Sequence, residues 1–260
     1  MDLGLKDKVY IVTGGSEGIG GGISEAIALE GGIPIIASWS RETTTNFVSK
    51  LKDQGLQADY ILGDLQDTLY CKEAIDFTYQ KYGRLDGIIN NAGSNDGASL
   101  EKGPEAFRKS LMLNLNHYFD LVHFALPYLK ESQGNILNIS SKVALTGQGG
   151  TSGYAAAKGA HLALTREWAL ELAPFGIRVN AIIPAEVMTP YYKKWLNVTF
   201  DNPEEKEKQI SSKVPFGSRM TKIEEIASLA VFLISSKSNH TTGQFLHADG
   251  GYVHLDRAIT

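Results

Sequence analysis

Short runs of apolar and β-branched residues alternate along the chain with longer segments in which apolar positions recur every three or four residues. Several of the short runs are apolar throughout, as is typical of strands covered by helices on both faces of a parallel sheet. The alternation predicts an α/β fold with one doubly wound, Rossmann-type, seven-stranded parallel sheet and helices on both faces. The predicted strands are Val9–Thr13, Ile33–Ser38, Ala58–Leu62, Gly87–Asn90, Asn135–Ser140, Arg178–Ile183 and Gln244–Ala248. The predicted helices are Gly20–Glu30, Thr43–Gln54, Tyr70–Tyr82, Pro104–Leu129, Ser152–Ala173 and Ile223–Ile234.

One segment departs from this alternation. Pro190–Lys213 is rich in aromatic and charged residues and follows the sixth predicted strand. Open α/β sheets bind ligands at the carboxyl ends of their strands, so we predict that this insertion forms a short lid over a site. The alternative is a solvated surface excursion. No linker or repeat divides the chain, and we expect a single domain over residues 1–260.

The amino-acid composition excludes several classes of protein. The chain has 25 Lys and Arg against 29 Asp and Glu, a net charge of −4, which gives no basic field for nucleic acid. A hydrophobic content of 43% is that of an ordinary folded protein. No apolar stretch is long enough to cross a membrane, and no signal peptide is visible at the start. The single cysteine, Cys71, forms no intrachain disulfide, so we expect a cytoplasmic protein.

Glycines gather where the first predicted strand meets the first helix. Thr13, Gly14, Gly18 and Gly20 have the spacing Gly-x-x-x-Gly-x-Gly. Glycines at such a turn let the backbone approach a pyrophosphate, which the free N–H groups at a helix start attract. Glycine is abundant in this chain, however, and helix packing alone is the competing explanation.

Polar and small residues lie at three further strand ends. Asp64 follows the third strand, Asn91, Ala92 and Gly93 follow the fourth, and Pro184 follows the sixth. Each residue is also common in ordinary turns. Their coincidence at successive strand ends predicts contacts along a dinucleotide, from the adenine to the nicotinamide.

Tyr154 and Lys158 are spaced to share one helix face, and Ser141 precedes them just after the fifth strand. Oxidation of an alcohol by hydride transfer needs a base for the hydroxyl proton. Lowering the pKa of a tyrosine from about 10 to about 7 needs roughly 4 kcal/mol, which an ammonium about 4 Å away can supply at an effective dielectric of about 20. We therefore predict Tyr154 as base, Lys158 as the group that lowers its pKa, and Ser141 as a hydrogen-bond donor to the substrate oxygen. Asn114 could hold a water beside Lys158, or its amide could satisfy the backbone of a kinked helix.

With these motifs in place, the chain resembles the short-chain dehydrogenase/reductase family over essentially its whole length. The resemblance is carried by TGGSEGIG (Thr13–Gly20), NNAG (Asn90–Gly93), Asn114, Ser141, Tyr154-x-x-x-Lys158 and the closing TGQ…DGG. It implies an NAD(P)-dependent oxidoreductase, usually a homotetramer, with Asn114, Ser141, Tyr154 and Lys158 as the catalytic set. It implies a cofactor site made of Thr13, Gly14, Ser16, Gly18, Ile19, Gly20, Ser38, Arg41, Asp64, Leu65, Asn91, Ala92, Gly93, Tyr154, Lys158, Pro184, Val187 and Thr189.

The family commonly has Pro-Gly after the sixth strand, but this chain reads Pro184-Ala185-Glu186. That phrase, together with NISSK, TGQGGTSGY, LTREWAL and DGGYVHLDRA, resembles the bacterial L-fucose dehydrogenase branch, which oxidises the anomeric carbon of an aldose to a lactone. A sugar presents hydroxyls to amides and carboxylates and packs its C–H face on aromatic rings. The substrate residues expected beside Ser141 and Tyr154 are Asn95, Gln148, Glu186, Tyr191 and Trp195, with Tyr192 as a further aromatic candidate; packing of the lid or of a subunit contact is the alternative for the aromatic rings.

The choice of cofactor is balanced. The end of the second strand carries no acidic residue to accept ribose hydroxyls, and Arg41 there suits a 2′-phosphate. Glu17 in the glycine turn would repel that phosphate. We expect NAD(P), with a slight preference for NADP. The six histidines show no metal-ligand spacing, so we expect no catalytic metal.

Two other functions stay open at this point. One is a dehydrogenase or reductase of another substrate, such as a 3-oxoacyl thioester, a steroid or a polyol. For a thioester on an acidic carrier, only Lys193 and Lys194 could supply a basic patch near the lid. The other is a nucleotide-sensing protein that has lost catalysis, which the intact Ser141, Tyr154 and Lys158 argue against.

Overall fold

Seven parallel strands form one sheet in the order β3-β2-β1-β4-β5-β6-β7 in the computed structural model, which describes residues 2–255. The predicted seven-stranded parallel sheet is confirmed. Chain order reverses between β1 and β4, and open sheets of this kind bind ligands in the crevice at that point. The strands are β1 (Val9–Thr13), β2 (Ile33–Ser38), β3 (Asp59–Leu62), β4 (Gly87–Asn90), β5 (Asn135–Ile139), β6 (Arg178–Pro184) and β7 (Phe245–Ala248).

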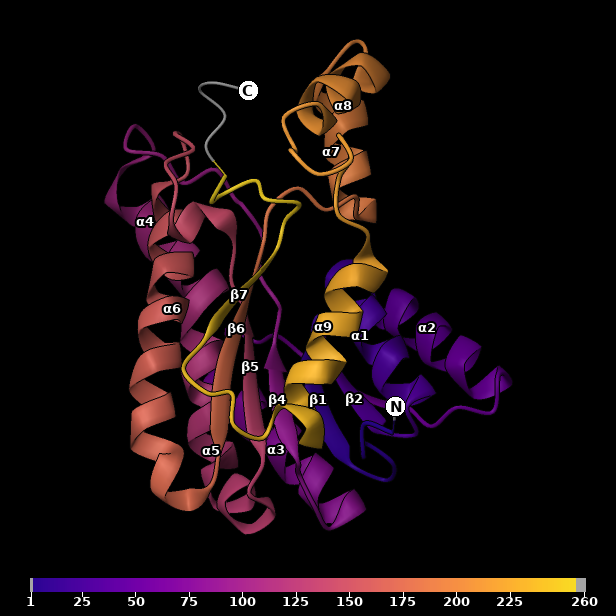
Figure 1. Cartoon of the computed structure of the whole chain (residues 1–260). Coiled ribbons are helices and arrows are strands. Elements are labelled where there is room, and N and C mark those ends of the chain that lie inside the picture. Colours follow the sequence, from indigo (N-terminus) through magenta and orange to yellow (C-terminus); the bar gives the residue numbers. More distant parts are fainter. Residues whose placement is uncertain (1, 256–260) are drawn as a thin grey trace.

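Helices cover both faces of the sheet (Figure 1). One face packs against α1 (Gly18–Leu29), α2 (Arg41–Asp53) and α9 (Ile223–Ile234). The other packs against α3 (Thr68–Tyr82), α5 (His117–Ser132) and α6 (Ser152–Leu172). Successive residues of a strand point to opposite faces, so Ile11 enters one core and Val12 the other. Burial on both faces explains why the strands are apolar throughout.

The long helix predicted over Pro104–Leu129 is wrong in one respect. It consists of α4 (Gly103–Leu111), a π-helical turn over Met112–Asn116, and α5. The Nδ2 atom of Asn114 donates to the carbonyl of Ser110, and the Nε2 atom of His161 binds the carbonyl of Asn114. These contacts hold a wider turn, which the ordinary helical period of the apolar residues does not reveal. The remaining predicted boundaries differ by one or two residues.

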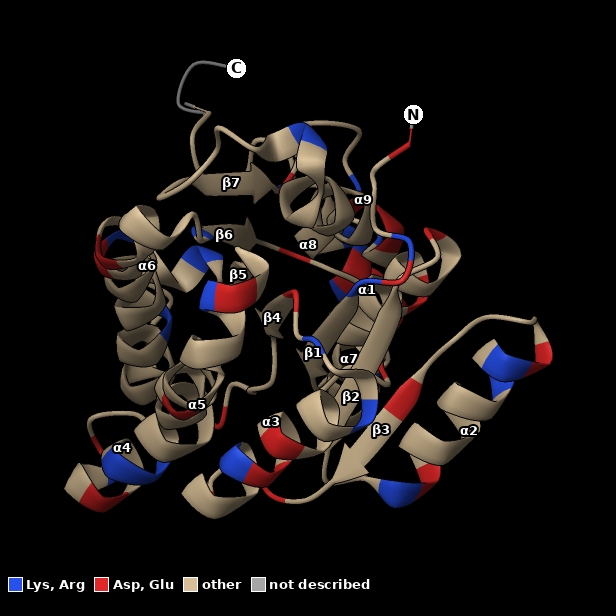
Figure 2. Cartoon of the chain, turned by 90° about the horizontal axis from the view of Figure 1, so that it is seen from below, with Lys and Arg blue, Asp and Glu red and all other residues tan. Residues whose placement is uncertain are grey.

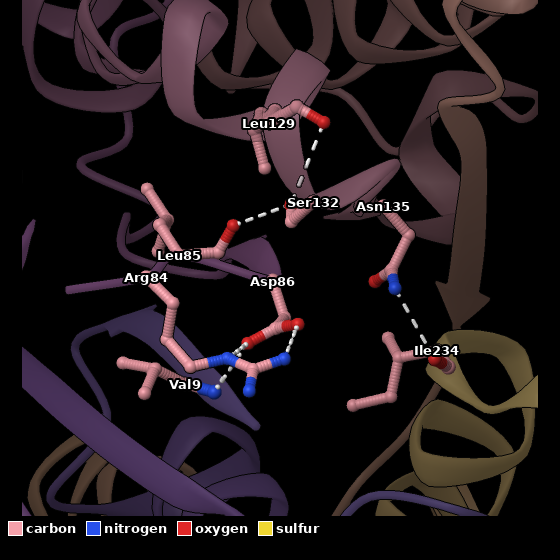
Figure 3. A network of polar contacts seen from close by, with 8 residues as sticks. All are labelled: Val9, Arg84, Leu85, Asp86, Leu129, Ser132, Asn135 and Ile234. Atoms are coloured by element: carbon pink, nitrogen blue, oxygen red, sulfur yellow. Dashed lines mark hydrogen bonds and ion pairs between the residues drawn. The ribbon is translucent and has the colours of Figure 1, made fainter. Parts of the chain in front are cut away.

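A network of polar contacts joins residues at the amino ends of the strands (Figure 3). Arg84 donates two hydrogen bonds of 2.8 Å to the carboxylate of Asp86, which also accepts from the backbone N–H of Val9. Asn135 donates to the carbonyl of Ile234 at the end of α9. The amino end of the sheet is therefore closed by internal contacts, and a ligand site is left to the carboxyl end.

Two helices of the predicted lid, α7 (Pro190–Thr199) and α8 (Pro203–Ser211), stand above the sheet (Figure 1). Short 3₁₀ turns follow β5 (Lys142–Ala144), α6 (Ala173–Phe175) and α9 (Ser236–Ser238). Basic and acidic residues are interspersed on the helices in the view of Figure 2, and no basic face for a polyanion is visible there. Within residues 2–255, no helix is both long and apolar enough to cross a membrane.

Candidate active site

A cavity of about 1130 Å³ lies at the carboxyl ends of the strands and extends from the glycine turn to the lid. The glycine turn after β1 forms one part of its wall, and Tyr191 and Trp195 of α7 form another. Lys206 and Ile210 of α8 also reach it. The cavity is large enough for a dinucleotide and a small substrate together, since ligand sites commonly span about 300 to 1,000 Å³.

The glycine turn has the shape that a pyrophosphate requires. Gly14 and Gly18 have φ angles of 60° and 54°, in the left-handed region that favours glycine. A Cβ on Gly20 would lie 2.4 Å from both the Nδ2 atom of Asn91 and the carbonyl of Gly14. The side chain of Glu17 makes no capping hydrogen bond to the first turn of α1. A tight turn followed by a helix start without a side-chain cap fits the phosphates of a dinucleotide.

Most of the predicted cofactor residues line this cavity, and three do not. Thr13 is buried, and its Oγ1 atom accepts from the backbone N–H groups of Asn91 and Ala92, so it ties β1 to the end of β4. Gly20 provides close packing behind the turn. Arg41 is exposed at the start of α2, outside the wall. The residues that line the cavity are Gly14, Ser16, Gly18, Ile19, Ser38, Asp64, Leu65, Asn91, Ala92, Gly93, Tyr154, Lys158, Pro184, Val187 and Thr189.

Ser141, Tyr154 and Lys158 meet in the same cavity. Ser141 caps the 3₁₀ turn that follows β5, and the other two side chains project from α6. The amine of Lys158 lies 5.5 Å from the centre of the Tyr154 ring. The three side chains therefore have the arrangement needed for proton transfer to or from a substrate oxygen.

The expectation that Lys158 lowers the pKa of Tyr154 is not met. Burial raises the pKa of Tyr154 to about 12, and a hydrogen bond with Ser141 offsets only part of the rise. Burial also lowers the pKa of Lys158 to about 7. The amine thus loses its own charge near neutral pH, because desolvation penalises every ionised group in this cavity. Tyr154 is therefore a neutral phenol at pH 7.

Lys158 lies in a pocket of uncharged groups. Its Nζ atom donates to the carbonyl of Ile139 at 2.8 Å and to the hydroxyl of Tyr118 at 3.5 Å. The ring of His161 stacks on Tyr118 with centroids 3.7 Å apart, and His117 packs edge-on against the same tyrosine. Burial and the nearby lysine lower the pKa of His117 to about 4 and that of His161 well below its usual value. Both imidazoles are therefore neutral at pH 7.

Asn114 has the structural role that was the alternative to holding a water. Its Oδ1 atom accepts from the backbone N–H of Ser94 at 2.8 Å, and its Nδ2 atom donates to the Ser110 carbonyl. The side chain is buried and does not line the cavity. It fixes the π-helical turn and the loop after β4, which places both beside Lys158.

Every predicted substrate residue lines the cavity, but their side chains are not equally free. The Oδ1 atom of Asn95 already accepts from Gly97 and Thr151. Glu186 is buried and bonded to Lys142 and Tyr192. Gln148, Tyr191 and Trp195 are exposed at the cavity wall.

Sequence reasoning did not assign several residues of the wall, among them Lys142, His117, Trp39 and Lys206. Lys142 directly follows Ser141, and His117 lies three positions after Asn114, so proximity to a catalytic candidate was the available signal. Trp39, 81% exposed, directly follows β2. Lys206 comes from the charged lid segment, where it resembled a solvated helix face. Between residues 2 and 255, no three His, Cys, Asp or Glu side chains group as metal ligands would.

Comparison with known proteins shows the family of the chain. The family model described as enoyl-(acyl carrier protein) reductase matches residues 14–253. Together with the relatives below, this match shows that the chain belongs to the short-chain dehydrogenase/reductase family, whose members are NAD(P)-dependent oxidoreductases acting on CH–OH groups. The chain is thus an oxidoreductase of this family.

Two curated relatives indicate the range of substrates. The chain is 34% identical to 3-oxoacyl-[acyl-carrier-protein] reductase FabG of Thermotoga maritima, covering 96% of this chain and 99% of the relative. It is 35% identical to L-fucose dehydrogenase of Bos taurus, covering 94% and 88%.

Two solved structures share the fold over the full length. The Cj0485 dehydrogenase is 47% identical with a TM-score of 0.94, covering 100% of this chain and 99% of that one. The aldohexose dehydrogenase of Thermoplasma acidophilum is 31% identical with a TM-score of 0.88 and the same coverage.

Proposed function

We propose that this oxidoreductase oxidises an aldose, L-fucose or a related sugar, at the anomeric carbon to the lactone. The observation that carries the proposal is the substrate end of the cavity, where Ser141 and Tyr154 lie beside the buried carboxylate of Glu186 and the rings of Tyr191 and Trp195. Such a wall offers hydrogen bonds to sugar hydroxyls and an aromatic surface to the C–H face. The similarity to an L-fucose dehydrogenase and to an aldohexose dehydrogenase supports this choice.

The reaction uses three side chains in distinct roles. Ser141 donates a hydrogen bond to the anomeric oxygen and orients it. Tyr154 takes the hydroxyl proton as the carbon gives up its hydride, and Lys158 favours the ionised phenol whenever its amine is charged. A nicotinamide cofactor, held by Gly14, Gly18 and Asn91 of the cavity wall, would supply the hydride acceptor. Asn114 keeps the backbone around Lys158 in place and touches no reacting atom.

The cofactor is NAD(P), and the preference between the two forms belongs to the proposal. Ser38, Ser40 and Thr43 present hydroxyls at the adenosine end, beside the start of α2. These groups suit a 2′-phosphate, with Arg41 exposed next to them. Glu17 also lines the cavity and opposes that charge. We propose a modest preference for NADP.

A substrate panel tests the function. Aldoses, polyols and 3-oxoacyl thioesters are assayed with NAD and with NADP while the absorbance of the reduced cofactor is followed. We expect turnover of L-fucose or a closely related aldose. Activity on 3-oxoacyl thioesters with none on any aldose would overturn the sugar assignment and leave the family unchanged.

Replacing the base tests the mechanism. Tyr154→Phe removes the proton acceptor and keeps the ring, so kcat should fall about 1,000-fold. Cofactor binding, followed by nicotinamide fluorescence, should change little. Undiminished turnover by this variant would refute the role of Tyr154.

Reduction of a 3-oxoacyl thioester is the second candidate. The family description and the Thermotoga maritima relative favour it. Lys206 of α8 adds a cation at the cavity, and α7 carries Lys193 and Lys194. The buried Glu186 disfavours it, because a carboxylate in the wall has no partner on an oxoacyl chain.

We further propose a cytoplasmic homotetramer. Phe119 on α5 and Leu170 on α6 are 54% and 78% exposed, and such residues are commonly covered in an oligomer. Sedimentation of the purified protein would measure the oligomeric state directly.

A further inference from the structure

A buried ion pair lies at the substrate end of the cavity. The amine of Lys142 contacts the Oε1 atom of Glu186, with the two side chains only 13% and 10% exposed. The hydroxyl of Tyr192 donates to the Oε2 atom of Glu186 at 2.7 Å. The amine of Lys142 also lies 4.4 Å from the ring centre of Tyr252. Lys142, Glu186 and Tyr192 all line the cavity.

Three separate segments bring these side chains together. Lys142 is the residue after Ser141, Glu186 lies two positions beyond the end of β6, and Tyr192 belongs to α7 of the lid. The backbone that positions Ser141 at the reacting oxygen therefore also positions Lys142. Ser141, Tyr154 and the pair line one cavity, so a ligand that reacts at Ser141 and Tyr154 shares that cavity with Lys142 and Glu186.

Stability alone does not account for this pair. Removing two charges from water costs about as much as their attraction returns, and apolar side chains of similar size often serve a fold equally well. A carboxylate offers about four acceptor sites and an ammonium three donors. Lys142 and Tyr192 each occupy one acceptor site of the Glu186 carboxylate. Acceptor sites of Glu186 and donor hydrogens of Lys142 therefore remain in the cavity wall for a ligand.

The charges and the remaining hydrogen-bond sites limit the chemistry of that ligand. The opposite charges cancel, and a phosphate or carboxylate would meet the Glu186 carboxylate. A ketone or an acyl chain has no proton to donate to the remaining acceptor sites of Glu186 and would cover them without a hydrogen bond. Two neighbouring hydroxyl groups meet both needs, because each hydroxyl donates and accepts.

We propose that Lys142 and Glu186 form a diol-binding site next to the reacting carbon, in which Tyr192 holds Glu186 in place. This site selects uncharged, polyhydroxylated substrates. This inference rests on the proposed sugar oxidation and adds the residues that decide specificity. Lys142 is assigned the donor role and Glu186 the acceptor role. Tyr192 links this site to the lid.

The test compares two substrates that share one reacting group. One is the aldose that the wild-type panel identifies, and the other is tetrahydropyran-2-ol, which has the same anomeric hydroxyl and ring but no further hydroxyl. The variants are Glu186→Gln, Lys142→Met and Tyr192→Phe, and Lys52→Met at an exposed position on α2 is the control. Initial rates give kcat/KM for each substrate.

The wild type should prefer the aldose over tetrahydropyran-2-ol by about 1,000-fold, as sites built to bind hydroxyls do. Glu186→Gln and Lys142→Met should each lower kcat/KM for the aldose about 100-fold and change that for tetrahydropyran-2-ol less than about threefold. Tyr192→Phe should have a smaller effect in the same direction. Analogues of the aldose that each lack one hydroxyl extend the test. At the two ring positions whose hydroxyls bind Lys142 and Glu186, loss of the hydroxyl should lower kcat/KM of the wild type and leave kcat/KM of the variants nearly unchanged.

Equal losses on both substrates would overturn the inference, since they would place the pair in the general scaffold or in the chemistry. Full discrimination in both variants would overturn it as well. If a single variant fails to fold, the double variant Lys142→Gln/Glu186→Gln removes both charges at once and is subject to the same comparison. A wild type inactive on every aldose would refute the proposed function first, before any variant is measured.

Discussion

Lys142 and Lys158, two of the lysines of the active-site cavity, lie in opposite electrostatic surroundings. Lys142 is paired with the carboxylate of Glu186. Lys158 is 3% exposed, its hydrogen bonds are to a carbonyl and a phenol, and burial lowers its pKa to about 7. A paired ammonium is a fixed charge, suited to binding. An unpaired buried amine can gain and lose a proton at neutral pH, which suits a reaction that releases one.

The neighbours of Lys158 reinforce this difference. His117 and His161 flank Tyr118 and are kept neutral partly by the lysine itself. A second positive charge in that pocket would be repelled by the first. Lys158 is thus the group of this pocket that takes up a proton near pH 7, and its charge state depends on what else is bound in the cavity.

The largest expected effect is on turnover by a Lys158→Met variant. Loss of the amine removes the charge that favours the ionised Tyr154, and kcat should fall about 1,000-fold. The measurement is the initial rate of cofactor reduction at saturating substrate. Lys52→Met, at an exposed position on α2, should keep wild-type turnover; a Lys158→Met variant that also keeps it would show that the unpaired amine has no part in the reaction.

Substitution of Lys158 and substitution of Lys142 should change the free energy of unfolding in opposite directions. At pH 6, Lys158→Met should raise the free energy of unfolding by about 2 kcal/mol, because the wild type buries an unpaired charge. Lys142→Met should lower it by a similar amount, because Glu186 then loses its partner. Denaturant unfolding of the three proteins measures both.

The gain from Lys158→Met should also shrink with pH. The folded wild type holds a neutral amine above about pH 7, whereas the unfolded chain keeps its proton up to the ordinary value of 10.5. The unfolded state then binds more protons, so the wild type gains stability as pH rises between these values. A difference that stays constant from pH 6 to pH 10 would contradict the low pKa of Lys158.

The smallest expected effect is a change in the pKa of Lys158 in a Tyr118→Phe variant. Tyr118→Phe removes one of the two acceptors of the amine and keeps the ring that stacks on His161. The hydrogen bond that the Tyr118 hydroxyl accepts from Lys158 favours the charged amine. Loss of this hydrogen bond should therefore lower the pKa of Lys158 by about half a unit. The chemical shift of ¹³C-labelled lysine, followed against pH, reports this change. An upward shift would be inconsistent with the proposed contact.

Local sequence was sufficient for much of the fold. The apolar strands, the order of elements and the glycine turn could be predicted because they depend on the residues within one element. The π-helical turn in the helix predicted over Pro104–Leu129 could not, since it depends on His161 of α6 reaching the carbonyl of Asn114. Arg41 was placed in the cofactor site by its position after β2, and the structure turns it outward.

For the site, the chain by itself determined which residues are available: Ser141 at a strand end, and Tyr154 and Lys158 on one helix face. Only the tertiary structure decided their electrostatics. Burial raised the pKa of Tyr154 where an adjacent lysine had suggested a fall. Lys142 and Glu186 are 44 residues apart and meet only because neighbouring strands end at the same edge of the sheet. Desolvation and pairing are properties of the folded surroundings, and so these effects could not be predicted from spacing along the chain.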